Sequence, residues 1–336
     1  MIQFANLRRI VRIVTFFVFL HFLLTKKNES KRMKGLVIRT TGSWYRVLAD
    51  SSTQVDCRLR GSYRLRGSKQ TNPIAVGDYV DFDMQDDGTG VIQEVCDRKN
   101  YIIRRATKLS KQTHVIAANV DQMFVVATLG FPRTSTGFID RLLVTAEAYH
   151  IPVCIVFNKA DLLAAEPSAQ SQLSSLRSLY ERVGYPVYET SALTGQGVDT
   201  IRQLVRGKVS LFTGHSGVGK SALVNAIDPS LNLRVGEVSD WSLKGKHTTT
   251  FAELFPFAGG FLIDTPGIKE CGMVDFKREE LSHFFPEMRE RLHACRFANC
   301  THTHEPQCAV RSAVESGDIS EERYTNYINI LESITE

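Results

Sequence analysis

The chain has 336 residues, of which 43% are apolar and 23% charged. This composition excludes a disordered, collagenous or coiled-coil protein, and the length fits two or three globular domains. The formal net charge is +5, but residues 1–32 hold seven basic residues and one acidic residue, so the rest of the chain is close to neutral. The overall charge therefore does not identify a nucleic-acid-binding protein, and any such surface must be local.

The N-terminal extension, residues 1–32, contains a short apolar segment over 13–24 with basic residues on both sides. The segment is shorter than the roughly 20 residues with which a helix crosses a bilayer. It resembles the core of a signal peptide, yet no cleavage site of small residues follows it. We expect translation to begin at Met33, and contact with a membrane only if residues 1–32 are present.

Residues 33–105 alternate short strand-like runs with glycine turns and contain no clear helical pattern. About five strands in 70 residues predict a small β-barrel, most simply an OB-fold. Its segment 58–69 has five cations and no acid, with Tyr63 among them; the cations are Arg58, Arg60, Arg64, Arg66 and Lys69. A basic loop with an aromatic residue indicates an RNA contact, although alternating arginines on a solvated strand would give the same pattern.

Residues 112–275 change to strands that alternate with amphipathic helices. The apolar runs 120–129 and 151–157 are typical of strands covered on both faces, and residues 139–150 between them have helical spacing. Further helices are expected at 171–184 and 197–207, with further strands at 208–214 and 259–265. This pattern predicts a doubly wound α/β domain.

A phosphate-binding loop follows the strand at 208–214 and precedes a helix. The motif G-x-x-x-x-G-K-[ST] is matched by Gly214, His215, Ser216, Gly217, Val218, Gly219, Lys220 and Ser221, and Ala222 continues it into the helix. Backbone N–H groups of such a loop surround phosphates, aided by the helix N-terminus. Lys220 is expected to reach the β- and γ-phosphates, and Ser221 to ligate Mg²⁺.

The sequence Asp-Thr-Pro-Gly at 264–267 ends the strand at 259–265. We expect Asp264 to hold Mg²⁺ through water and the N–H of Gly267 to contact the γ-phosphate. This motif is only moderately specific alone, but it is informative beside a phosphate-binding loop.

A guanine-binding site is predicted by two segments that each follow a strand. Asn158, Lys159 and Asp161 form an N-K-x-D motif, in which the aspartate accepts hydrogen bonds that guanine offers and adenine cannot. The second segment is the partner loop, whose backbone would contact the guanine O6, and it consists of Ser191, Ala192 and Leu193.

The C-terminal segment, residues 276–336, has three cysteines and a histidine within 14 residues. Cys295, Cys300 and Cys308 with His302 supply the ligands of a closed, structural zinc site, although His304 could replace His302. The small number of cysteines excludes a disulfide scaffold and indicates a reducing, cytoplasmic location.

The motif order is unusual, because the guanine-binding motifs precede the phosphate-binding loop. This arrangement resembles the RsgA family, circularly permuted GTPases of small-ribosomal-subunit maturation. The resemblance covers residues 33–336 and implies an N-terminal OB-fold, a permuted P-loop GTPase domain and a mostly helical zinc-binding domain. It favours His302 as the fourth zinc ligand and implies GTP hydrolysis stimulated by the small subunit, rRNA binding and a monomeric protein.

The resemblance also assigns the segment 246–250 to a switch in which one threonine completes the Mg²⁺ coordination. Thr249 is the expected ligand, and His247 is a candidate for positioning the attacking water, because Ile268 stands where Ras-like enzymes have a glutamine. Two other functions remain open. One is a membrane-associated GTPase switch with a protein partner, and the other is an RNA-binding assembly factor for which GTP is a structural ligand.

Overall fold

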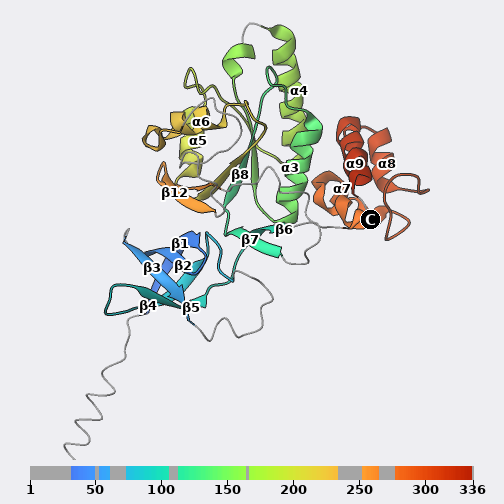
Figure 1. Ribbon diagram of the computed structural model, residues 1–336. Helices are drawn as coiled ribbons and strands as arrows, with labels where there is room; N and C mark the ends of the chain where they lie inside the picture. The colour runs from blue at the N-terminus through green and yellow to red at the C-terminus, as the bar shows by residue number, and fades with distance from the viewer. Residues whose placement is uncertain are drawn as a thin grey trace, which may run out of the picture.

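The computed structural model describes residues 32–49, 53–60, 73–105, 113–163, 166–233, 252–264 and 277–334. The segments 1–31 and 61–72 lie outside these residues, and the second of them includes most of the basic segment 58–69. The chain forms an N-terminal barrel, a central α/β domain and a C-terminal helical region beside it (Figure 1). Within the described ranges, no helix has the length and apolar character needed to cross a bilayer.

The predicted barrel is confirmed. Its strands are β1 (Met33–Thr41), β2 (Trp44–Ala49), β3 (Gln54–Leu59), β4 (Tyr79–Met84) and β5 (Gly90–Val95). β1 pairs with both β2 and β4, and β3 runs parallel to β5, so the sheet closes on itself in the order 1-2-3-5-4. Alternate residues of β3 point inward, as expected for a closed barrel. The core includes Val37, Val47, Phe82 and Ile92, all without solvent exposure.

The central domain is the predicted doubly wound sheet. Its order is β10-β9-β8-β11-β13-β12, and all neighbours are parallel except β12, which is antiparallel to β13. The sequence did not predict β12. The strands are β8 (Gln122–Ala127), β9 (Val153–Phe157), β10 (Val187–Glu189), β11 (Val209–Thr213), β12 (Glu253–Phe257) and β13 (Gly260–Asp264).

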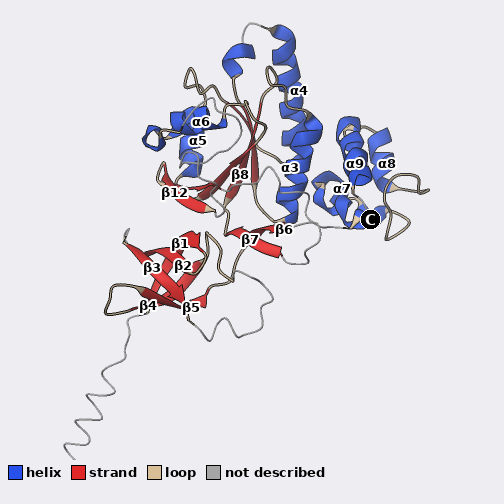
Figure 2. Ribbon diagram, viewed as in Figure 1, coloured by secondary structure: helices blue, strands red, loops and turns tan. Residues whose placement is uncertain are grey.

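Helices cover both faces of this sheet (Figure 2). Along β8, Met123 and Val125 belong to one buried cluster, whereas Phe124 and Val126 belong to the other. This alternation follows from the two-residue period of a strand and explains why the strand is continuously apolar. The helices are α3 (Thr136–Ala148) and α4 (Pro167–Val183) on the first face, and α5 (Val198–Val205) and α6 (Lys220–Ile227) on the second.

Barrel and central domain meet at a small second sheet of β6 (Tyr101–Arg105) and β7 (Thr113–Ala118). The domain boundary predicted at 105–112 falls between these two strands. In addition, β1 pairs with β12 at Arg39 and Glu253, so the barrel also continues the edge of the central sheet.

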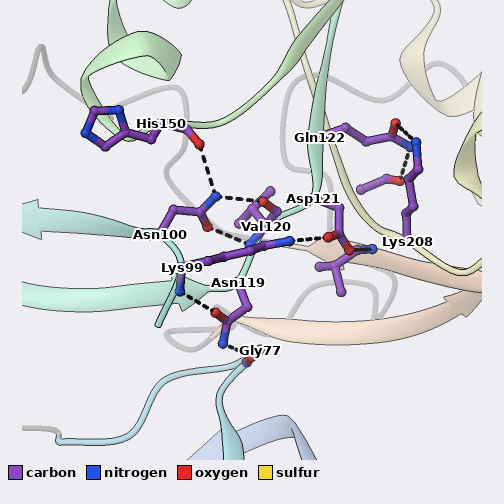
Figure 3. Close-up of polar contacts among 11 residues, drawn as sticks. Gly77, Lys99, Asn100, Asn119, Val120, Asp121, Gln122, His150 and Lys208 are labelled. Carbon is purple, nitrogen blue, oxygen red and sulfur yellow. Dashed lines mark hydrogen bonds and ion pairs between the residues drawn. The ribbon is translucent and has the colours of Figure 1, made fainter. Parts of the chain in front are cut away.

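Two buried asparagines hold this junction together (Figure 3). The side chain of Asn100 donates to the carbonyl oxygens of Val120 (2.8 Å) and His150 (3.2 Å), and it accepts from the Val120 N–H. Asn119 donates to the Gly77 carbonyl (2.9 Å) and accepts from the Lys99 N–H (2.9 Å). These asparagines fix the barrel at the amino ends of β8 and β9, whereas the contact between β1 and β12 lies beside Asp264, at the carboxyl end of β13.

The C-terminal region is helical and packs on α3. Its elements are η6 (Arg278–Phe284), α7 (Pro286–Arg289), η7 (Leu292–Ala294), α8 (Ala309–Glu315) and α9 (Glu321–Ser333). Val144 of α3 belongs to the same buried cluster as Phe285, Tyr327 and Ile330 of this region.

A buried ion cluster joins α9 to α3. Arg323 has 1% of its side chain exposed and donates to Asp140 Oδ1 (2.6 Å) and to both carboxylate oxygens of Glu287 (2.8 and 3.0 Å). Asn326 and Tyr180 donate to the Asp140 carboxylate at 2.7 and 3.1 Å. Buried charges need such partners, because an unpaired charge in the interior is costly.

Replacing Arg323 with Met should therefore destabilise the whole protein. The change leaves two buried carboxylates without their cation, and we expect the free energy of unfolding to fall by about 3–5 kcal/mol in urea titrations. The control Arg182→Met removes an exposed arginine of α4 and should change it by less than about 0.5 kcal/mol. A similarly small effect at Arg323 would contradict this role of the cluster.

Candidate nucleotide site and metal centre

The predicted nucleotide motifs meet at one edge of the central sheet. In chain order, β8, β9 and β10 extend the sheet in one direction, and β11 returns to pair with the other side of β8. The strand order thus reverses between β8 and β11, and ligands of open α/β sheets bind at the carboxyl ends of the strands beside such a reversal. The loops at 214–219 and 158–161 follow β11 and β9 there.

The phosphate-binding loop is held closely against β8. A Cβ atom on Gly214 would lie 2.1 Å from the Val126 carbonyl oxygen, and Gly214 has a φ of +148°. Only glycine fits both restraints. Helix α6 begins at Lys220, so its first N–H groups point toward the loop. The Lys220 Nζ donates to the carbonyl oxygens of Gly214 (2.9 Å) and His215 (2.6 Å).

The second residue of this loop touches α3. The His215 ring stacks on Phe138, with ring centroids 3.5 Å apart. Partial burial and the nearby Lys220 ammonium both lower the pKa of His215 and so favour its neutral imidazole. The other predicted members of the loop are Ser216 and Gly217, which are exposed, and Val218, which is buried.

Asn158 connects the guanine motif to the phosphate-binding loop. Its side chain is buried, donates to the Val218 carbonyl (2.9 Å) and accepts from the Thr190 hydroxyl (3.1 Å). Gly219 lies so close that a Cβ there would be 2.5 Å from Asn158 Nδ2. Three loops from three strands are therefore fixed relative to one another.

The two predicted guanine segments also contact each other. The Ser191 hydroxyl donates to Asp161 Oδ1 (2.5 Å) and accepts from the Thr194 N–H (3.1 Å). Ala192 is partly buried, whereas Leu193 is 85% exposed. An ordered carboxylate at Asp161 suits recognition of the adjacent N–H groups of guanine.

Asp264 ends β13, the parallel neighbour of β11, and is 6% exposed. It thus lies on the same edge of the sheet as Lys220, Ser221 and Ala222 at the start of α6. Thr249, His247 and Gly267 lie outside the described residues, and their roles stay predictions.

The cysteine cluster is assembled in the C-terminal region. The potential ligand atoms of Cys295, Cys300, His302 and Cys308 all lie within 4.8 Å of one another. His302 Nδ1 is 3.3 Å from Cys308 Sγ and 3.7 Å from Cys295 Sγ. Bonds of 2.0 and 2.3 Å in a tetrahedron give ligand separations of about 3.5 Å, so this donor set fits Zn²⁺.

The surroundings of the cluster orient its histidine. Burial lowers the pKa of His302 and favours the neutral ring that binds a metal. Its carbonyl accepts from the Tyr324 hydroxyl (2.6 Å), and the Tyr327 hydroxyl donates to the adjacent Thr301 carbonyl (2.7 Å). His304 is exposed and is not part of the cluster.

Several residues of the site were not predicted from the sequence. Thr190 immediately precedes the predicted Ser191, and a threonine in this position, directly after a strand, is the sequence signal that could have identified it. Phe138 had no such signal, because its partner His215 is 77 residues away. The loop at 128–134 was not predicted either, although its Gly-Phe-Pro sequence after β8 indicates a turn.

Comparison with known proteins gives consistent matches over nearly the whole described chain. The family model for the RsgA GTPase matches residues 95–274, and that for the RsgA N-terminal domain matches residues 34–92. A small ribosomal subunit biogenesis GTPase RsgA from Bacteroides fragilis is 54% identical over 301 residues, which cover 89% of this chain and 96% of the relative. A relative of the same description from Christiangramia forsetii is 47% identical over 304 residues, with 89% and 96% covered.

Two solved structures are similar to this one. The crystal structure of YjeQ from Thermotoga maritima has a TM-score of 0.74 and 37% identity, with 90% of this chain and 98% of that chain covered. The structure of YloQ, described as a circularly permuted GTPase, has a TM-score of 0.73 and 32% identity, with 91% and 96% covered.

The geometry predicts that Asn158 stabilises the site before any ligand binds. Asn158→Ala leaves the Val218 carbonyl and the Thr190 hydroxyl without this partner. We expect the unfolding free energy of the nucleotide-free protein to fall by about 1–3 kcal/mol. Asn329→Ala, at an exposed position of α9, is the control, and an equal effect of the two substitutions would refute the assignment.

Proposed function

The chain belongs to the RsgA family of GTPases, and we propose that it hydrolyses GTP to GDP and phosphate during maturation of the small ribosomal subunit. The observation that carries the proposal is the bridge made by Asn158, which joins a phosphate-binding loop to an N-K-x-D motif at the strand reversal. The described function of the relatives favours this activity over a membrane-associated switch.

The positions of the nucleotide-binding residues support the following proposed roles. Lys220 supplies a positive charge at the phosphates, and Asp161 reads the guanine edge in the orientation that Ser191 fixes. Ser221 and Asp264 would hold Mg²⁺, which supplies charge neutralisation at the transferred phosphoryl group. Ser221 lies at the start of α6, which follows β11, and Asp264 ends β13, the strand paired with β11, and this placement supports the assignment. Thr249, Gly267 and His247 are proposed to complete the site.

The barrel and the C-terminal region are proposed to contact ribosomal RNA. On the barrel, the Arg58 guanidinium lies 3.9 Å from the centre of the Trp44 ring, which presents a cation and an aromatic surface together. Arg60 directly follows β3, the strand that carries Arg58, and donates to the Gln93 side chain of β5 at 3.1 Å. Arg64, Arg66 and Lys69 extend this basic segment outside the described residues. We infer that a monomer binds in this way.

The Cys₃His cluster is proposed to hold one structural zinc ion. All four ligands come from the protein, so the site has no open position for a substrate. The ion would fix the loop 295–308 against α8 and α9 and thereby shape the C-terminal region.

GTP turnover by the full chain, with and without isolated small ribosomal subunits, tests the function. We expect subunits to raise the rate of phosphate release at least about tenfold, which is a lower bound beside the roughly 10³–10⁵-fold gain that an activating arginine gives other GTPases. Lys220→Ala should lower the stimulated rate by about a hundredfold, and ATP should give no stimulated turnover. Binding of GTP without any stimulation by subunits would instead support its use as a structural ligand.

Replacement of one metal ligand tests the zinc site. Cys300→Ser should reduce the zinc content per chain well below one and destabilise the C-terminal region, because metal binding is coupled to folding there. Cys96→Ser, a partly buried cysteine of the barrel, should keep its zinc. Full metal content in the Cys300 variant would disprove the ligand set.

A further inference from the structure

The loop between β8 and α3, residues 128–134, has a shape fixed by its own hydrogen bonds. The Thr134 N–H donates to the Thr128 carbonyl (2.9 Å), and the Thr128 N–H donates to the Thr134 hydroxyl (3.1 Å). The Thr128 hydroxyl also donates to the Pro132 carbonyl. The tip of the loop, Phe131 and Pro132, is therefore held in one position relative to the sheet.

This tip contacts both nucleotide motifs. The Lys159 Nζ donates to the Phe131 carbonyl at 3.0 Å, so the side chain of this N-K-x-D lysine extends from the guanine loop to Phe131. On the other side, a Cβ atom on Gly217 would lie 3.3 Å from Pro132 Cγ. Phe131 thus lies between the guanine motif and the phosphate-binding loop.

The Phe131 side chain is nevertheless almost free of protein contact. It is 89% exposed, more than any other large apolar side chain among the described residues. Its main chain is anchored while its ring has no protein surface to cover. An exposed aromatic ring beside a nucleotide site is well suited to contact the nucleoside, because every base has a π-face that can stack on it.

We propose that Phe131 packs against the guanosine of the bound nucleotide. A base whose edge is read by Asp161 lies next to the Lys159 stem, and that stem leads to Phe131. Stacking depends on the face of the base and not on its edge, so Phe131 contributes affinity while Asp161 contributes guanine selectivity. Because this stacking does not involve the γ-phosphate, Phe131 contributes equally to the affinities for GTP and GDP. This inference rests on the proposed guanine-nucleotide binding.

The test uses the full chain and two fluorescent probes, mant-GDP and the non-hydrolysable mant-GMPPNP. Phe131→Ala should raise the Kd of both probes by a similar factor, roughly tenfold, the scale of losing one base–aromatic stack. Phe131→Trp should restore affinity, and its tryptophan fluorescence should change when unlabelled GDP binds, relative to the same titration of wild type. Tyr79→Ala, an exposed aromatic on the barrel, should bind both probes as wild type does.

The outcomes separate this inference from the proposed function. Because Phe131 is so exposed, its alanine variant should unfold at the wild-type urea concentration, which excludes a folding defect as the cause of weak binding. If wild type binds mant-GDP and Phe131→Ala binds it equally well, the inference is wrong while the proposed function stands. If only subunit-stimulated hydrolysis falls, the ring contacts the ribosome and the inference is again wrong. Failure of wild type to bind either probe would overturn both.

Discussion

The nucleotide edge depends on one buried amide, that of Asn158, which joins loops separated by 60 residues along the chain. A buried amide is stable only with its donors and acceptors satisfied, so the loops after β9, β10 and β11 have a single relative arrangement. The hydrogen bonds of Asn158 require that the ends of β9, β10 and β11 lie close together in space. They do not depend on the order in which the three loops occur along the chain. This explains how circular permutation can leave a guanine-nucleotide site intact while it changes which loop comes first.

The parts of the fold governed by local pattern could be predicted from the sequence, and those governed by distant pairing could not. The apolar runs of β8 and β9 identified a sheet covered on both faces, and the glycine and lysine spacing of the phosphate-binding loop located the site edge. In contrast, β12 is an antiparallel strand that contains a proline, Pro256, and lacks a clear strand pattern. Phe131 could not be identified from the sequence, because its proximity to Lys159 exists only after folding.

The three parts of the molecule are held together by different kinds of contact. The barrel is fixed by hydrogen bonds around Asn100 and Asn119, at the amino ends of β8 and β9, and by the pairing of β1 with β12. The C-terminal region is fixed along α3, whose first turn carries Phe138 against His215 of the phosphate-binding loop. Helix α3 therefore touches the nucleotide edge at one end and the C-terminal region along its length, which provides a direct physical route between them in addition to the chain segment after β13.

The ion cluster around Arg323 also has a consequence for biosynthesis. Asp140 precedes Arg323 and Asn326 by 183 and 186 residues in the chain, so its carboxylate is synthesised long before the groups that neutralise and bind it. The face of α3 that carries Asp140 and Val144 packs on residues of the C-terminal region. This interior therefore forms only after translation has passed α9, and the C-terminal region takes part in completing the fold of the α/β domain.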